Sequence, residues 1–120
     1  MKPCLGRIII YAKNIEKMRL FYETFFGYKS RQRPGDRMIE LNPSSGGAVI
    51  LLHPMAKSVK PGQVNVKLVF DVKNVEAFKA ACLKNGLKFG AIYEADGYSF
   101  CNAKDPDKNS IQISSRGFTP

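Results

Sequence analysis

Apolar residues near the start of the chain change from a short continuous run to a helical stripe. The run "RIIIYA", residues 7–12, is short and rich in β-branched residues, so it predicts a strand. The apolar positions that follow at helical spacing are Ile15, Met18, Phe21, Tyr22 and Phe25. Asn14 can cap the start of this helix and Gly27 can end it. The pattern therefore predicts a strand followed by a helix.

Seven short candidate strands and a second helix account for most of the remaining chain. "YKSRQR", "RMIELN" and "GGAVILLH" are separated by the turn-forming "PGD" and "PSSGG". After the linker "PMAKSVKPGQ" the order restarts with the strand "NVKLVFDV" and a helix that Asn74 can cap and "NG" can end. The stripe of this helix holds Val75, Phe78, Ala81 and Cys82. Strands near "KFGAIYEA", "YSFCNAK" and "SIQISS" follow, with "DPDKN" as the last turn.

The two halves repeat one β-α-β-β-β order. "KNIE" at the first helix recurs as "KNVE" at the second, and the same spacing aligns Arg7 with Lys67. We therefore predict two equivalent modules, residues 5–54 and 64–116, within a single domain over residues 1–120.

Strand alternation divides the side chains of each sheet between two faces. The residues expected beneath the helices are Ile8, Ile10, Val66, Leu68, Phe70, Ile111 and Ile113. Those expected on the opposite, mixed face are Arg7, Ile9, Tyr11, Leu51, His53, Asn65, Lys67, Val69, Ser110, Gln112 and Ser114. One helix leaves one face of a four-stranded sheet bare, so two half-sheets facing each other would form a polar cleft.

Composition narrows the class of protein. A chain of 120 residues, 44% of them hydrophobic, has room for one domain with a real core. Its three cysteines show no paired spacing, which predicts neither a disulfide framework nor a zinc knuckle. The N-terminal apolar run is too short for a signal peptide, and no run reaches the roughly 18 residues of a membrane span. We expect a cytoplasmic protein without a membrane association.

A formal charge of +9 would attract anionic partners over long distances. Lys29, Arg31 and Arg33 recur at period two, so they are expected to share one face of a strand. The simplest interpretation of such a face is that it is solvated. The second is that it attracts ligands at the edge of a binding site, and the third is that it binds nucleic acid. No nucleic-acid-binding motif is present, so the sequence disfavours the third.

The segments "NIEKMRLFYETFFGYK", "DVKNVEAFKAACLKNGLK" and "AKDPDKNSIQI" resemble the helix and last-strand signatures of the glyoxalase, bleomycin-resistance and extradiol-dioxygenase superfamily, also called vicinal oxygen chelate. The resemblance covers nearly the whole chain. It implies an α+β fold in which two βαβββ modules form a curved, half-open barrel. It also implies a homodimer.

The same resemblance indicates four positions at which metal-dependent members hold their ion. Carried over to this chain, these positions hold Arg7, Leu51, Lys67 and Gln112. Only Gln112 offers a usable donor atom, since an arginine or a lysine ammonium has no lone pair to give. At about 4 Å and an effective dielectric constant near 20, each cation would repel a divalent ion by about 8 kcal/mol. We therefore expect neither a metal nor another cofactor.

Arg7 and Lys67 are the candidate ligand-binding cations, and Arg7 can make a two-pronged contact to a carboxylate or phosphate. The neutral hydrogen-bonding groups predicted beside them are Tyr11, Asn65, Gln112 and Ser114, and Leu51 and His53 complete the predicted site. The competing reading is that the two cations pair with acidic residues such as Glu40 or are simply solvated. His53, the only histidine, could carry protons, yet no motif places a nucleophile beside it, and the catalytic residues stay unknown.

The leading hypothesis is a metal-free member of this family that binds a small, acidic organic molecule. A cationic drug such as bleomycin would be repelled by Arg7 and Lys67. The alternative is a glyoxalase-like lyase or isomerase, or a dioxygenase, that holds a metal through other ligands such as His53, Glu40 or Glu94. A nucleic-acid or protein interaction module rests on the +9 charge alone.

Overall fold

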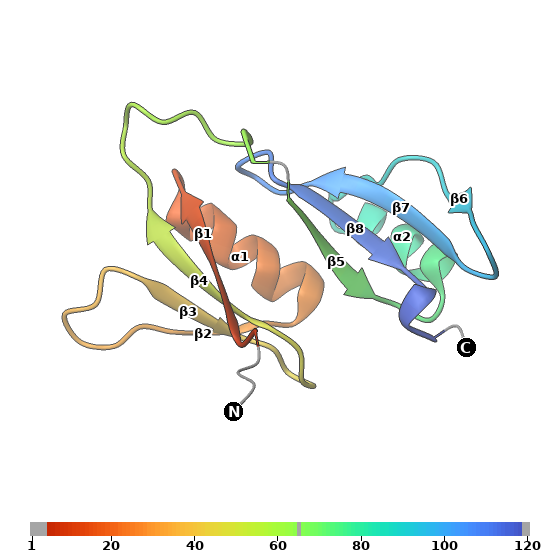
Figure 1. The fold of residues 1–120 in the computed structure, drawn as a ribbon, viewed down its shortest axis with the longest axis horizontal. Helices are drawn as coiled ribbons and strands as arrows, with labels where there is room; N and C mark the ends of the chain where they lie inside the picture. The colour runs from red at the N-terminus through yellow and green to blue at the C-terminus, as the bar shows by residue number, and fades with distance from the viewer. Residues whose placement is uncertain (1–4, 65, 119–120) are drawn as a thin grey trace. The chain divides into compact units, whose positions relative to one another are not determined.

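Two four-stranded sheets, each with one helix against one of its faces, make up the structure (Figure 1). The computed structural model describes residues 5–64 and 66–118. The chain divides into two units, and the boundary between them falls between Pro61 and Gly62. Residues 5–61 are called unit 1 below, and the described residues from 62 to 118 are called unit 2.

Unit 1 follows the predicted β-α-β-β-β order. Its elements are β1 (Arg7–Ala12), α1 (Ile15–Phe26), β2 (Lys29–Arg31), β3 (Ile39–Asn42) and β4 (Val49–Pro54). The strand order in the sheet is β1-β4-β3-β2. β1 runs parallel to β4, whereas β3 is antiparallel to both β4 and β2. β1 and β2 therefore form the two edges of the sheet, and β3 and β4 lie between them.

Unit 2 repeats this topology. Its elements are β5 (Lys67–Asp71), α2 (Val75–Lys84), β6 (Tyr93–Glu94), β7 (Ser99–Lys104), β8 (Ser110–Ser114) and the 3-10 helix η1 (Arg116–Phe118). The strand order is β5-β8-β7-β6, with β5 parallel to β8. Arg7 and Lys67 each begin the first strand of their unit, as the repeat predicts. The predicted α+β fold class with two βαβββ modules is confirmed; their union in one domain over residues 1–120 stays a prediction.

Local signals set the ends of both helices. The side chain of Asn14 accepts a hydrogen bond from the backbone N–H of Lys17 at 3.2 Å, and that of Asn74 accepts one from Ala77 at 3.0 Å. Each cap satisfies a backbone N–H group that the first helical turn leaves without a partner. Gly27 ends α1 in the left-handed conformation, with φ of 67°, and its N–H donates to the carbonyl of Tyr22. The predicted caps and helix ends are therefore confirmed.

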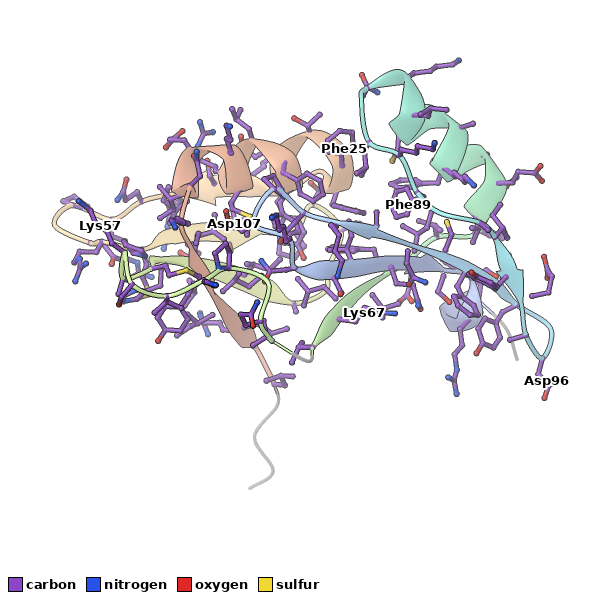
Figure 2. All side chains as sticks on the ribbon, turned by 90° about the horizontal axis from the view of Figure 1, so that it is seen from above. Phe25, Lys57, Lys67, Phe89, Asp96 and Asp107 are labelled. Atoms are coloured by element: carbon purple, nitrogen blue, oxygen red, sulfur yellow. The ribbon has the colours of Figure 1, made fainter. Side chains whose placement is uncertain are left out.

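The hydrophobic core of each unit lies between its helix and its sheet. In unit 1 the buried apolar residues are Ala12, Met18, Phe21, Tyr22, Tyr28, Ile39, Leu41, Ile50 and Leu52. In unit 2 they are Val75, Cys82, Leu87, Phe89, Cys101, Ile111 and Ile113. Figure 2 shows Phe89 between α2 and the sheet of unit 2. Because the helices cover these faces, the opposite face of each sheet is the one that can meet a ligand.

Several local expectations were wrong. Arg33 follows the end of β2, so it does not share a strand face with Lys29 and Arg31. Val66 precedes β5 and is 59% exposed instead of lying beneath α2. Ala81 is exposed as well, although helical spacing placed it on the buried stripe. β6 has only two residues, far fewer than the stretch "KFGAIYEA" predicted, because its ladder to β7 contains only two residue pairs.

The segment "DPDKN" is the predicted turn between β7 and β8. The carboxylate of Asp105 accepts hydrogen bonds from the backbone N–H groups of Asp107 and Asn109, both at 2.9 Å. Lys108 adopts a positive φ of 66° in this turn. Gly62 packs against it so closely that an added Cβ would lie 2.9 Å from the carbonyl oxygen of Lys108. The turn and the start of unit 2 thus fit together only because Gly62 has no side chain.

Candidate functional site

Four of the predicted site residues lie on the face of the unit 1 sheet that α1 does not cover. The register of β1 and β4 pairs Ile9 with Leu51 and Tyr11 with His53. Directly paired residues point to the same side of a sheet, and alternation puts Arg7 on that side too. Arg7, Tyr11, Leu51 and His53 therefore share one face, as the parity of the sequence predicted.

Tyr11 and His53 form the aromatic end of this face. Their ring centroids lie 5.0 Å apart with the planes tilted by 49°. Nδ1 of His53 lies 2.7 Å from the carbonyl oxygen of Pro54. Tyr11 is 55% exposed, whereas His53 is half-buried. The pair thus combines an accessible phenol ring with an imidazole whose orientation a backbone group fixes.

Glu40 lies on the same face but interacts with another cation. It pairs with Leu51 across the strands and with Arg31 on its other side. Its carboxylate is 3.3 Å from a terminal nitrogen of Arg31, and Arg31 is largely exposed. The competing reading paired Glu40 with Arg7 or Lys67, and the ion pair seen here is with Arg31 instead. The Arg31 side chain is 59% exposed and the Glu40 side chain 14%, so water screens the pair from the arginine side.

Lys67 and Gln112 meet on the corresponding face of unit 2. The ammonium Nζ of Lys67 donates to Oδ1 of Asn102 at 3.1 Å, and Nε2 of Gln112 donates to the same oxygen at 2.9 Å. The three residues come from β5, β7 and β8, which lie side by side in the order β5-β8-β7. We call Lys67, Asn102 and Gln112 the donor cluster. Figure 2 shows Lys67 at the start of β5.

Asn102 is the member of the donor cluster that sequence reasoning missed. Its signal was present in "SFCNAK", because a buried Cys101 on the helix side requires Asn102 to point the other way. The register confirms this, since Asn102 pairs directly with Gln112.

A second cation, Lys104, lies in the same row of this face as Lys67. Nζ of Lys104 donates to the hydroxyl of Ser110 at 2.8 Å. Ser110 pairs directly with Lys67 on one side and with Lys104 on the other. Since neighbouring strands lie about 4.8 Å apart, the two lysine backbones are about 10 Å from each other. This end of the face is therefore positively charged.

Ser114 is placed less favourably for ligand contact. It is 2% exposed, and its hydroxyl accepts a hydrogen bond from the backbone N–H of Arg116 at 3.1 Å. The segment after β8 folds back as η1 and packs near β5. A ligand would reach Ser114 only if this segment moved. The remaining predicted residue, Asn65, lies outside the described residues.

The cysteines of the described chain do not have the properties of nucleophiles. Cys82 and Cys101 are buried, as expected for small core residues. Burial raises the pKa of each thiol, because an apolar environment disfavours the thiolate. A thiol that resists ionisation is a poor nucleophile at neutral pH. Cys4 lies outside the described residues.

The residues at the metal positions of the family do not fit a divalent ion. Arg7 and Lys67 are cations, and Leu51 is apolar, which leaves Gln112 as the only donor of the four. The amide of Gln112 is turned so that its nitrogen donates to Asn102. Within residues 5–64 and 66–118, no three His, Cys, Asp or Glu side chains are grouped closely enough to hold a metal ion. No helix in the same ranges is long and apolar enough to cross a membrane.

Comparisons with known proteins agree with the fold. The sequence model of the glyoxalase/bleomycin resistance protein/dioxygenase superfamily matches residues 5–113. No curated protein shows significant sequence similarity to the chain.

Solved structures extend this likeness over both modules. UcmS2 superposes with a TM-score of 0.80 at 15% identity, over 96% of this chain and 99% of its own. TnmS3, an antibiotic binding protein from Streptomyces sp. CB03234, gives 0.77 at 18% identity, over 93% and 94%. A lactoylglutathione lyase from Agrobacterium tumefaciens gives 0.72 at 16% identity, over 94% and 93%. At such low identities these structures establish the fold.

Proposed function

Because the chain belongs to the glyoxalase/bleomycin resistance protein/dioxygenase superfamily, we propose that it is a metal-free member that binds a small acidic organic molecule. The observation that carries the proposal is the shared oxygen of the donor cluster, Oδ1 of Asn102, which accepts from both Lys67 and Gln112. The proposal concerns binding and assigns no catalytic residue.

The donor cluster has the chemistry of an anion site. With its oxygen turned toward Lys67 and Gln112, the Asn102 amide has its two Nδ2 hydrogens left for other acceptors. An ammonium has three N–H groups, and the bond to Asn102 takes one of them. A carboxylate or phosphate offers acceptors only, so it complements Lys67 and the Asn102 amide together. Hydrogen bonds to a charged acceptor are stronger than those between neutral groups.

Arg7 is the second cation in the proposal. It begins β1 as Lys67 begins β5, and it is exposed on the face that α1 does not cover. A guanidinium can grip a carboxylate or phosphate with two parallel hydrogen bonds. Arg7→Ala and Lys67→Ala test the contribution of each cation separately.

A binding role has a precedent in this fold, because TnmS3 is an antibiotic binding protein. The ligand proposed here is acidic, since a cationic drug would be repelled by Arg7 on the face of unit 1 and by Lys67 and Lys104 on the face of unit 2. A metal-free site is supported by the residues at the four positions where metal-dependent members hold their ion, because only Gln112 among them can coordinate a metal. Metal-activated lyase, isomerase or dioxygenase chemistry is the alternative, and it would need ligands other than these four.

The proposal is tested by thermal unfolding with simple acids as probes: citrate, 2-oxoglutarate and benzoate at millimolar concentrations. Bound acid raises the melting temperature of the wild type, since a ligand that binds only the folded state stabilises it. Lys67→Ala and Arg7→Ala should reduce this rise. Lys88→Ala is the control, because Lys88 is exposed and lies outside the strands of the sheet. An equal rise in all four proteins would contradict the proposal.

Native mass spectrometry of the gently purified protein tests the remaining expectations. We expect a homodimer without a divalent ion, and a dimer carrying one ion per subunit would contradict the metal-free assignment. Adding Mn²⁺, Ni²⁺ or Zn²⁺ to the melting assay provides an independent check. Metal stabilisation that His53→Ala abolishes would assign His53 as a ligand and favour the metalloenzyme alternative.

A further inference from the structure

The uncovered face of unit 1 changes in character along β1 and β4. Three directly paired rows cross these two strands: Arg7 with Val49, Ile9 with Leu51, and Tyr11 with His53. The first row is cationic at β1, the second is wholly apolar and the third is aromatic. A strand rises about 3.3 Å per residue, so the first and third rows lie about 13 Å apart.

His53 has a defined tautomer in its neutral form. Its Nδ1 is 2.7 Å from the carbonyl oxygen of Pro54, and a carbonyl oxygen can only accept a hydrogen bond. Nδ1 must therefore carry the proton. Neutral imidazole has one N–H, so Nε2 is left with a lone pair and acts as a hydrogen-bond acceptor.

The middle row and Tyr11 beside it provide an apolar surface that water reaches. Ile9 is 49% exposed and Tyr11 is 55% exposed, although apolar and aromatic side chains gain from burial. A flat apolar body placed over Ile9 and against the ring of Tyr11 would remove this area from water. The surface lies between an arginine at one end and an imidazole acceptor at the other.

From this order we propose that the β1–β4 face binds an aromatic acid bearing a hydroxyl group, with His53 accepting the hydroxyl hydrogen. Arg7 binds the acidic group, and Ile9, Leu51 and Tyr11 contact the ring system. The inference rests on the proposed function and adds the ligand class to it. His53 then acts as a specificity residue that distinguishes hydroxylated from unsubstituted aromatic acids.

Three naphthalene probes separate the contributions. 6-Hydroxy-2-naphthoate has both groups at opposite ends, 2-naphthoate lacks the hydroxyl and 2-naphthol lacks the acid. Calorimetric titration of the wild type should show 6-hydroxy-2-naphthoate binding about fivefold more tightly than 2-naphthoate, as one added hydrogen bond predicts. 2-Naphthol should bind more weakly than 6-hydroxy-2-naphthoate because it lacks the charge that Arg7 recognises.

Variants assign each difference to a residue. His53→Phe keeps a ring and removes the acceptor, so the fivefold advantage of the hydroxyl should vanish, and His53→Gln, which supplies an amide oxygen, should restore part of it. Arg7→Ala should weaken both acids by the same factor and leave 2-naphthol unchanged. Arg33→Ala removes the same charge from an exposed position beyond β2 and should change none of the three affinities.

The tautomer can be read without any ligand. The chain has a single histidine, so a long-range ¹H–¹⁵N spectrum contains one imidazole. At pH 8.5, above the range in which imidazoles usually titrate, the spectrum should show protonated Nδ1 and unprotonated Nε2. The opposite tautomer would overturn the inference, because Nε2 would then donate.

The outcomes distinguish this inference from the proposed function. Equal binding of the two naphthoates, or a hydroxyl advantage that survives in His53→Phe, overturns the inference. The proposed function stands in that case if Lys67→Ala still weakens citrate, 2-oxoglutarate or benzoate. Failure of all three naphthalene probes to bind overturns the inference, and failure of the simple acids as well overturns both.

Discussion

Lys67 and Asn102 are joined by a 3.1 Å hydrogen bond that crosses β8, the strand between their own. Lys67 pairs directly with Ser110 and Asn102 with Gln112, so the bond runs diagonally from one row to the next. Diagonal neighbours are far enough apart that only a long side chain reaches across. Side chains from β5, β7 and β8 therefore meet at one amide oxygen, Oδ1 of Asn102.

Asn102→Asp tests whether the amide nitrogen binds the acid. Aspartate supplies an oxygen that can still accept from Lys67 and Gln112, but it replaces the Nδ2 donor with negative charge. Binding of citrate or benzoate should weaken by about tenfold or more, because repulsion replaces a hydrogen bond. The melting temperature without ligand should change little. Isothermal titration calorimetry provides the affinities.

Asn102→Ala is the matched comparison. It removes both the donor and the acceptor, so it should weaken acid binding and also cost about 1 kcal/mol of stability through the two lost bonds. If Asn102→Asp bound the acids as tightly as the wild type, the cluster would be structural and the ligand would lie elsewhere. Lys88→Ala lowers the net charge by one, as Asn102→Asp does, and so controls for that change in charge.

The fold could be predicted because its signals are local and occur twice. Asn14 and Asn74 cap equivalent helices, and strand alternation correctly placed Ile111 and Ile113 in the core. Each of these signals depends on a few neighbouring residues. Val66 was misplaced because the strand begins one residue later than its apolar pattern, and strand boundaries depend on pairing rather than on composition.

The candidate site could be predicted only in part. Parity put Lys67 and Gln112 on one face, but the sequence does not state that a lysine reaches diagonally to Asn102. Ser114 was expected to be accessible, and it is buried because the chain after β8 folds back as η1. Such features depend on side-chain conformation and on irregular segments, for which the sequence carries no periodic signal.

Removing either helix cap should destabilise the protein by similar amounts. Asn14→Ala and Asn74→Ala each leave a backbone N–H of the first helical turn without its partner, which costs about 1 kcal/mol. Urea denaturation followed by circular dichroism measures the loss. Asn14→Asp and Asn74→Asp should retain most of the stability, since aspartate also caps helices. If the aspartate variants were as unstable as the alanine variants, the lost cap would not be the cause of the destabilisation.

Gly62→Ala should be more harmful than Gly86→Ala. Both glycines have a positive φ, of 76° and 89°, so alanine is strained at either position. At Gly62 the new methyl would also lie 2.9 Å from the Lys108 carbonyl oxygen, whereas Gly86 has open space. We expect about 1 kcal/mol for Gly86→Ala and at least about 2 kcal/mol for Gly62→Ala. Equal losses in urea denaturation would mean that the turn shifts to accept the methyl.

Stability should fall at alkaline pH, and Tyr28 should account for part of the fall. Burial raises the pKa of its phenol, whose hydroxyl donates to the carbonyl of Ala48 at 3.0 Å. A raised folded pKa means that the unfolded chain loses its proton first, so stability is fully present at neutral pH. It declines once the pH passes about 10, where an unfolded tyrosine ionises.

Tyr28→Phe separates this titration from that of other groups. At pH 7 the variant should be less stable by about 1 kcal/mol, because the bond to Ala48 is lost. Between pH 9 and pH 11 its stability should fall less steeply than that of the wild type. Part of the fall should remain, because burial also raises the pKa of Cys82 and Cys101. The free energy of unfolding, measured by urea denaturation, can be plotted against pH for both proteins. If the two plots were parallel, folding would not raise the pKa of Tyr28.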